Sequence, residues 1–297
     1  MKTLKIAIIG KPFKLEVLPF IQQLFDELQN RGAEIIVVEH FKTFLENNLR
    51  LPENSGSFGR GDSLFGVDFV FSIGGDGTLL DTVTYIGAKE LPIVGINTGR
   101  LGFLATISKD TIPAALEALY RGHFSIDRRA LIRVDSEIEI FDGINFGLNE
   151  FSLLKRDSSS MIVVHTYIDG EYLNSYWADG LVVATPTGST GYSLSCGGPV
   201  VLPQSNNFVI SPVCPHNLNV RPMIVSDRSV ISFEVEGRSN NFLVSLDSRS
   251  KAVDATVQLA VRKEDFSACL VRMNNVNFLT TLRSKLNWGF DNRNYNN

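Results

Sequence analysis

Two different hydrophobic patterns divide the chain near residue 124. Before this point, continuous apolar runs occur at Ile6–Ile9, Ile35–Val38, Val67–Ile73 and Ile93–Ile96. Such runs are typical of parallel strands that are buried on both faces. Segments with apolar residues at helical spacing lie between the runs, as in Leu18–Leu28. The pattern predicts an α/β N-terminal domain with a parallel sheet covered by helices.

The region from residue 125 to residue 274 has a different pattern. Its Val-, Ile- and Phe-rich segments are short, and turn signals such as Asp142-Gly143 separate them. Ile162–Ile168 leads directly into Asp169-Gly170, which predicts a β-hairpin. We therefore expect a mostly antiparallel all-β C-terminal domain, and domain bounds of 1–124 and 125–274.

Three further segments complete the predicted organisation. Glu53–Asp62 is rich in Gly, Ser and Asn, and it is predicted to be a mobile loop. Asn277–Trp288 has helical character, and Asp291–Asn297 is a polar tail.

Composition and charge narrow the classes of function. The 297 residues carry a net charge of −4, whereas a protein whose main partner is nucleic acid is usually basic. No apolar run approaches the ~20 residues of a membrane-spanning helix, and no signal peptide is evident. The three cysteines are far apart, which excludes a CxxC zinc site and fits a reducing cytoplasm. The four histidines lack metal-ligand spacing, so no metal site built by the protein is expected.

The first segment with chemical potential is Gly74-Gly75-Asp76-Gly77-Thr78, where the third parallel strand should end and a helix should begin. Parallel sheets bind ligands at this end of their strands, and glycines let the backbone approach a phosphate group. Thr78 is expected to cap the helix. Asp76 is poorly suited to binding phosphate but well suited to accepting a proton from an attacking hydroxyl. The alternative is a tight turn with a capping Asp. No GxxxxGK[ST] or GxGxxG motif occurs, so phosphate chemistry would use another design.

Two weaker segments follow. After Asn97, Arg100 could meet phosphate and Phe103 could stack on a base, although a strand-end loop with Phe103 in the core explains them equally well. Asn149 suits an adenine edge and Glu150 suits ribose hydroxyls. A polar strand end is the simpler interpretation of that pair.

A richer segment runs from residue 179 to residue 195, where a buried strand leads into a turn. Five hydroxyl groups, on Thr185, Thr187, Ser189, Thr190 and Tyr192, are more than a helix cap needs. We expect them to meet ribose and phosphate oxygens, with a capped helix start as the alternative. Asp247, which follows a later strand, is expected to be a turn residue.

Taken together, these segments resemble the NAD kinase family. The matching residues are Gly74–Thr78, Asn97–Phe103, Asn149-Glu150 and Asp179–Ser193, in the family's order. The first motif is shared with 6-phosphofructokinases and diacylglycerol kinases. The combination of the Asn-Glu pair with the Thr-Gly-Ser-Thr turn is specific to NAD kinases.

The resemblance implies transfer of the γ-phosphate of ATP to the 2′-hydroxyl of the adenosine ribose of NAD, giving NADP. Asp76 matches the proton acceptor, and Mg²⁺ should arrive with ATP. A cytoplasmic homodimer or homotetramer is implied, with residues 275–297 packing back on the first domain. The implied binding residues are Gly75, Gly77, Thr78, Phe103, Asn149, Glu150, Asp179, Ser189, Thr190, Gly191, Tyr192, Ser193, Leu194 and Ser195.

The chain also departs from the family pattern. The family commonly has Ala in place of Gly191, and often has Asp-Gly-Gln where this chain has Asp247-Ser248-Arg249. Two rival functions stay open: a lipid or sugar kinase of the same superfamily, and a non-catalytic NADP-sensing module. The Asn149-Glu150 pair argues against the first rival, and Asp76 argues against the second.

Overall fold

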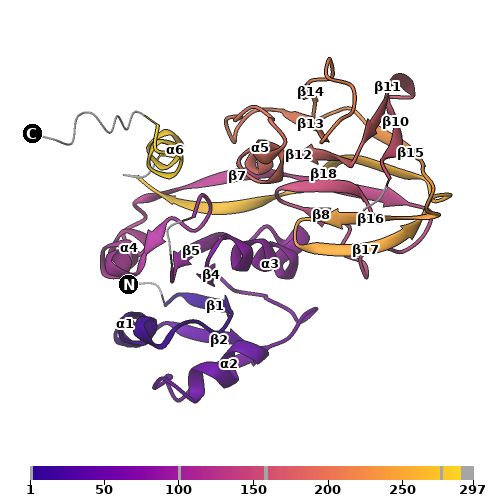
Figure 1. Cartoon of the computed structure of the whole chain (residues 1–297). Helices are drawn as coiled ribbons and strands as arrows, with labels where there is room; N and C mark the ends of the chain where they lie inside the picture. The colour runs from indigo at the N-terminus through magenta and orange to yellow at the C-terminus, as the bar shows by residue number, and fades with distance from the viewer. Residues whose placement is uncertain (1–2, 100–101, 157–159, 275–276, 289–297) are drawn as a thin grey trace, which may run out of the picture. The chain divides into compact units, whose positions relative to one another are not determined.

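The computed structural model describes residues 3–99, 102–156, 160–274 and 277–288 (Figure 1). It divides the chain into two compact units. Unit 1 comprises residues 1–127 and 269–297, and unit 2 comprises residues 128–268. Arg100 and the expected polar tail at 291–297 lie outside the described residues.

Unit 1 is built on a parallel sheet. Its central strands have the order β5-β4-β1-β2-β3, and every neighbouring pair is parallel. The bounds are β1 Lys5–Gly10, β2 Glu34–Val38, β3 Gly56–Phe58, β4 Phe69–Gly74, β5 Ile93–Asn97 and β6 Ile107–Ser108. Every residue of β4 and β5 is buried, which explains their continuous apolar sequence. The predicted parallel α/β class is confirmed.

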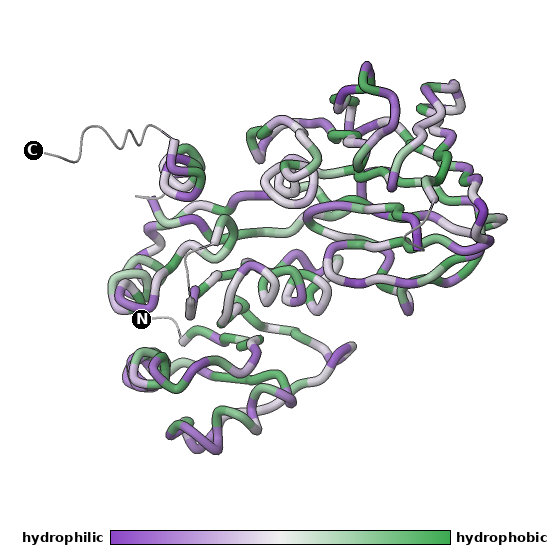
Figure 2. The backbone as a smooth tube through the Cα atoms, in the orientation of Figure 1, coloured by the Kyte–Doolittle hydropathy of each residue, from purple (hydrophilic) through white to green (hydrophobic). Residues whose placement is uncertain are grey.

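Helices accompany this sheet in unit 1. Their bounds are α1 Leu18–Asn30, α2 Glu39–Glu46, α3 Asp76–Ile86, α4 Ile112–Tyr120 and α6 Phe278–Leu286, with short 3₁₀ turns at Leu15–Val17, Gly87–Lys89 and Lys109–Thr111. Helix α1 buries Ile21, Leu24, Phe25 and Leu28, which lie on one helical face. Figure 2 shows hydrophobic and hydrophilic residues on opposite sides of this helix. No helix in the described part of the chain is long and apolar enough to cross a membrane.

The prediction of a loop without a strand at Glu53–Asp62 is wrong, because β3 lies there. Gly56 pairs with Ile36 and Phe58 pairs with Val38 in parallel register. Phe58 is buried. A short edge strand can be held by the backbone of its neighbour, so it needs no apolar run of its own.

Unit 2 contains two antiparallel arrangements of strands. One sheet has the order β14-β13-β12-β9-β16-β17, and β11, β10 and β15 pair in turn beside β18. The bounds are β7 Phe124–Ser136, β8 Phe146–Gly147, β9 Glu150–Lys155, β10 Ile162–Ile168, β11 Glu171–Ala178, β12 Gly180–Ala184, β13 Asn207–Val213, β14 Met223–Ser226, β15 Ile231–Glu236, β16 Asn241–Leu246, β17 Arg249–Asp254 and β18 Leu259–Met273. Strands β7 and β18 extend from this unit into unit 1.

Inward-facing side chains of these strands form the core of unit 2. The rings of Phe151 and Phe233 stack with their centroids 5.5 Å apart. Along β16 buried and partly buried residues alternate, as expected for a strand with one covered face. The β10–β11 hairpin forms as predicted, and both Asp169 and Gly170 adopt the positive φ that its tight turn requires.

Candidate active site

The segment Gly74–Thr78 lies where the sequence predicts, at the carboxyl end of β4 and the start of α3. Gly74 pairs with Asn97 at the end of β5, and the Thr98 N–H donates to the Gly74 carbonyl at 3.2 Å. The first two predicted segments therefore meet at one edge of the parallel sheet of unit 1. This is the edge at which such sheets bind ligands.

Gly75 and Gly77 leave space beside the first turn of α3. A Cβ atom built at either position would have no heavy atom of the described structure within 4 Å. Neither glycine has a positive φ, so the backbone does not demand glycine at these positions. Helix α3 also lacks a side-chain cap. Its first N–H groups, at the positive end of the helix dipole, are therefore open to an anion.

The expectation that Thr78 caps this helix is wrong. Helix α3 begins at Asp76, and its N-cap residue is Gly75. Thr78 lies inside the first turn, is buried, and donates its N–H to the Gly75 carbonyl at 3.0 Å. Its side chain covers Gly74, where any Cβ would overlap it. Glycine is itself a favourable N-cap residue, which is why the helix starts earlier than the Thr suggests.

The Asp76 carboxylate binds the loop that follows β5. Its Oδ2 accepts the Phe103 N–H at 2.8 Å, and its Oδ1 accepts the N–H groups of Leu104 and Ala105, both at 3.1 Å. A Cβ at Gly102 would overlap this carboxylate, so only glycine fits there. A carboxylate has about four acceptor positions, and three are used. One acceptor position therefore remains, on Oδ2.

Asn97 adds a donor that sequence reasoning did not assign to a role. Its side chain is 2% exposed, and its Oδ1 accepts the Gly99 N–H at 2.7 Å. Its Nδ2 has no hydrogen-bond partner among the described residues. A buried donor without an acceptor is costly, which points to an acceptor supplied by a ligand.

In unit 2 the third and fourth predicted segments form one cluster. The Thr185 N–H donates to the Asn149 carbonyl at 2.8 Å, and a Cβ at Gly188 would overlap the same residue. A Cβ at Gly191 would lie 2.9 Å from Glu150 Oε2. The backbone N–H of Tyr192 also favours the charged form of the Glu150 carboxyl group and so lowers its pKa. The Asn-Glu pair thus lies against the turn formed by Thr187–Thr190 and helix α5 (Tyr192–Ser195).

Several hydroxyl groups of this turn are used inside unit 2. Of the five that were expected to meet a ligand, those of Thr185, Thr187 and Ser189 belong to buried residues and have partners within the unit. Ser193, which the resemblance implies as a binding residue, is also buried, and its Oγ lies 2.8 Å from Ser211 Oγ. The structure therefore corrects the expectation that the whole set of hydroxyls meets a ligand. Exposed surface remains at Thr190, Gly191, Tyr192, Leu194 and Ser195.

The Glu150 carboxyl group has a strongly raised pKa. Burial, reinforced by the charge of Asp247, raises its pKa to about 7, and the Tyr192 N–H opposes the shift. Its Oε2 has no hydrogen-bond partner in the described structure. Burial and nearby thiols raise the pKa of Tyr192, and Asp179 and Glu150 contribute to that shift. Asp179, which pairs with Lys155 Nζ at 2.7 Å, therefore belongs to the same neighbourhood.

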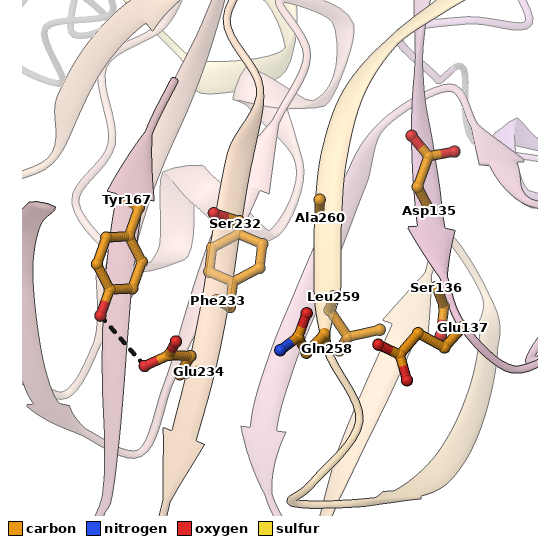
Figure 3. A pocket seen from close by; sticks show the side chains of 10 residues that line it. All are labelled: Asp135, Ser136, Glu137, Tyr167, Ser232, Phe233, Glu234, Gln258, Leu259 and Ala260. Atoms are coloured by element: carbon orange, nitrogen blue, oxygen red, sulfur yellow. Dashed lines mark hydrogen bonds between the residues drawn. The ribbon is translucent and has the colours of Figure 1, made fainter. Parts of the chain in front are cut away.

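A separate cavity of about 390 Å³ lies on strands of unit 2 (Figure 3). None of the predicted site residues lines it. Its lining is acidic: Asp135 pairs with Arg262 Nε at 2.6 Å, and the Tyr167 hydroxyl donates to Glu234 at 3.1 Å. An acidic lining does not suit a phosphorylated ligand, so this cavity is not the candidate active site.

Both units match known protein families. Residues 6–124 match the ATP-NAD kinase N-terminal domain, and residues 148–273 match the ATP-NAD kinase C-terminal domain. The chain is 54% identical to the NAD kinase of Cytophaga hutchinsonii, over 97% of this chain and 99% of that protein. It is 41% identical to the NAD kinase of Christiangramia forsetii, over 98% and 100% of the two lengths.

Two solved structures share the fold. Yeast NADH kinase complexed with NADH has a TM-score of 0.87 at 22% identity, covering 97% of this chain and 89% of that one. An NAD kinase from Archaeoglobus fulgidus in complex with ATP has a TM-score of 0.71 at 27% identity, covering 96% and 99%. Sequence matches across both units and along nearly the whole chain show that it belongs to the ATP-NAD kinase family.

Proposed function

We propose that this chain transfers the γ-phosphate of ATP to the 2′-hydroxyl of the adenosine ribose of NAD, giving NADP, with Asp76 as proton acceptor. Relatives named NAD kinase that match along almost the whole chain support the reaction. The observation that carries the mechanism is the Asp76 carboxylate, which stands at a strand end beside open N–H groups and keeps one acceptor position.

The phosphates of ATP would lie at the start of α3. Gly75 and Gly77 leave room for them, and the helix N-terminus favours their negative charge. The Nδ2 of Asn97 supplies a further donor. These groups are donors, so they fit phosphate oxygens and not a metal ion. Mg²⁺ would therefore be carried by the phosphates, and when bound it would neutralise their charge.

Asp76 would accept the proton of the attacking hydroxyl. A bond forms between the ribose 2′-oxygen and the γ-phosphorus, the bond to the β–γ bridging oxygen breaks, and ADP leaves. The hydroxyl proton passes to Oδ2 of Asp76, which the Phe103 N–H holds in a fixed orientation. Fixed orientation matters because phosphoryl transfer depends mainly on positioning and charge neutralisation.

The dinucleotide would bind through the cluster of unit 2. The ionised Glu150 would accept from ribose hydroxyls and Asn149 would bind the adenine edge. The other proposed contacts are Phe103, Asp179, Thr190, Gly191, Tyr192, Leu194 and Ser195. We further propose a cytoplasmic homodimer or homotetramer. Free cysteines fit the cytoplasm, and the exposed apolar side chains of Trp177, Leu218 and Ile224 fit a surface that a second copy covers.

The open space at Gly77 gives the first prediction. Gly77→Ala should leave thermal stability unchanged or raise it by up to about 1 kcal/mol, because Ala is the better helix former. The same methyl group should obstruct the phosphates and raise KM for Mg-ATP at least tenfold. Gln23→Ala, an exposed change on α1, is the matched control and should change neither KM. An unchanged KM for Mg-ATP in Gly77→Ala would contradict the phosphate assignment.

The second prediction concerns Asp76. In an NADP-forming assay with NAD and Mg-ATP, Asp76→Asn should lower kcat by about a thousandfold, while calorimetry shows NAD binding within a few-fold of wild type. Gln23→Ala, an exposed change on α1, is the control and should keep the kcat of wild type. A kcat of Asp76→Asn close to that of wild type would contradict the role of Asp76 as proton acceptor.

The same assay separates the rival functions. Wild-type protein that forms no NADP would refute the proposed reaction. Turnover of a sugar or lipid instead would favour the superfamily rival, and dinucleotide binding without any turnover would favour a sensing module.

The third prediction follows from the titration of Glu150. Its pKa rises from 4.5 to about 7 on folding, so the folded state binds the extra proton between these values. Stability should therefore fall as pH rises through this window, by at most about 3 kcal/mol. Glu150→Gln cannot ionise and should be more stable than wild type at about pH 8, with little difference at about pH 4. It should also bind NAD more weakly. Equal stability of the two proteins at high pH would contradict the buried, charge-coupled state of Glu150.

A further inference from the structure

The turn between β16 and β17 grips the segment that carries Asn149 and Glu150. Asp247 lies in this turn and adopts a positive φ of 53°, an uncommon conformation that Asp tolerates better than most residues. Its N–H donates to the Glu150 carbonyl at 2.9 Å. The turn position was expected from the sequence, but its contacts with residues about a hundred positions away were not.

The Asp247 carboxylate accepts three successive N–H groups of that segment. Oδ2 accepts from Leu148 at 2.7 Å, and Oδ1 accepts from Asn149 at 2.8 Å and from Glu150 at 3.2 Å. A Cβ at Gly147 would lie 2.9 Å from the carboxylate, so the approach is close. Charge-assisted bonds to three neighbouring amides fix the direction of the backbone at this point.

Arg249 binds the part of the same segment that precedes Gly147 in the sequence. Its guanidinium donates to the carbonyl oxygens of Ile144 and Phe146, the second at 2.5 Å, and lies 5.6 Å from the centre of the Phe141 ring. Asp247 therefore accepts hydrogen bonds from N–H groups of residues 144–150, and Arg249 donates hydrogen bonds to carbonyl groups of the same segment. A planar guanidinium with several donors suits two carbonyl acceptors at once.

Thr185 completes the backbone pairing. Its Oγ1 donates to the Leu148 carbonyl at 2.6 Å, and its N–H donates to the Asn149 carbonyl at 2.8 Å. Every backbone N–H and carbonyl group of residues 148–150 thus has a partner. Only the side chains of these three residues can therefore bind a ligand. Their directions are set by the hydrogen-bonded backbone.

We infer that Asp247 and Arg249 are positioning residues that orient Asn149 and Glu150 toward the dinucleotide. The inference rests on the proposed function, because it assigns a cause to the geometry of the proposed NAD-binding cluster. Asp247 and Arg249 act through the backbone of residues 144–150 and need not touch NAD themselves.

The test measures KM for NAD and for Mg-ATP in four variants of the full chain. Asp247→Asn places an amide N–H₂ against backbone N–H groups, and Arg249→Met removes the donors while keeping the length of the side chain. Each should raise KM for NAD at least tenfold and change KM for Mg-ATP less than twofold. Arg249→Gln, which keeps an amide donor, should recover most of the loss. Asp254→Asn, at the far end of β17, is the matched control and should match wild type.

A pH profile separates positioning from general damage. The titratable groups coupled to Glu150 are Asp247, Tyr192 and Cys196. Burial raises the pKa of the phenol, of the thiol and of the Asp247 carboxyl, but three backbone N–H groups and Arg249 oppose the shift at Asp247. Because both oxygens of Asp247 accept N–H groups, its carboxylate supplies the charge beside Glu150. Asp247→Asn should therefore move the pH dependence of KM for NAD to lower pH, a change that loss of stability alone does not produce.

Distinct outcomes would overturn the inference. A wild-type KM for NAD in both Asp247→Asn and Arg249→Met would do so, and so would parallel increases in both KM values with an unshifted pH profile. If Asp247→Asn does not fold, Arg249→Met against Arg249→Gln decides the matter by the same criterion. Failure of wild type to form NADP is a different result, since it refutes the proposed function and removes the basis of the inference.

Discussion

A carboxylate that accepts three successive backbone N–H groups is the interaction on which the candidate residues of each unit depend. Asp76 binds the N–H groups of residues 103–105 in unit 1, and Asp247 binds those of residues 148–150 in unit 2. Adjacent N–H groups that point the same way cannot satisfy one another, so an anion must do so. Each charge-assisted bond contributes about 1.5–3 kcal/mol, enough to hold an irregular strand end in one conformation.

This constraint separates two kinds of glycine. Gly102 and Gly147 lie against the Asp76 and Asp247 carboxylates, where a side chain would collide. The fold itself requires glycine at these positions. Gly75 and Gly77 face open space with ordinary φ values, so nothing in the described structure requires glycine there. Gly75 also suits the N-cap position of α3, so Gly77, inside the first turn, is the stronger structural sign of a phosphate site there.

Sequence patterns predicted the elements that are determined by residues close together in the chain. Continuous apolar runs identified β1, β2, β4 and β5 because burial on both faces leaves a direct mark on the sequence. Strand β3 was not predicted, because its pairing with β2 stabilises it and its composition does not indicate a strand. The Thr78 cap failed because Gly75 fills that role, and Ser189 and Ser193 proved to be structural hydroxyls. The grip of Asp247 and Arg249 on residues 144–150 could not be predicted, since it joins segments about a hundred residues apart.

Hydrogen exchange of individual backbone amides tests this carboxylate clamp most directly. Residues 103–105 and 148–149 lie outside the strands, so without a partner their amides would exchange nearly as fast as those of an open loop. In wild type we expect protection by at least about a hundredfold, and in Asp76→Asn we expect loss of protection at residues 103–105 alone. Unprotected amides in wild type, or protection that survives removal of the carboxylate, would contradict it.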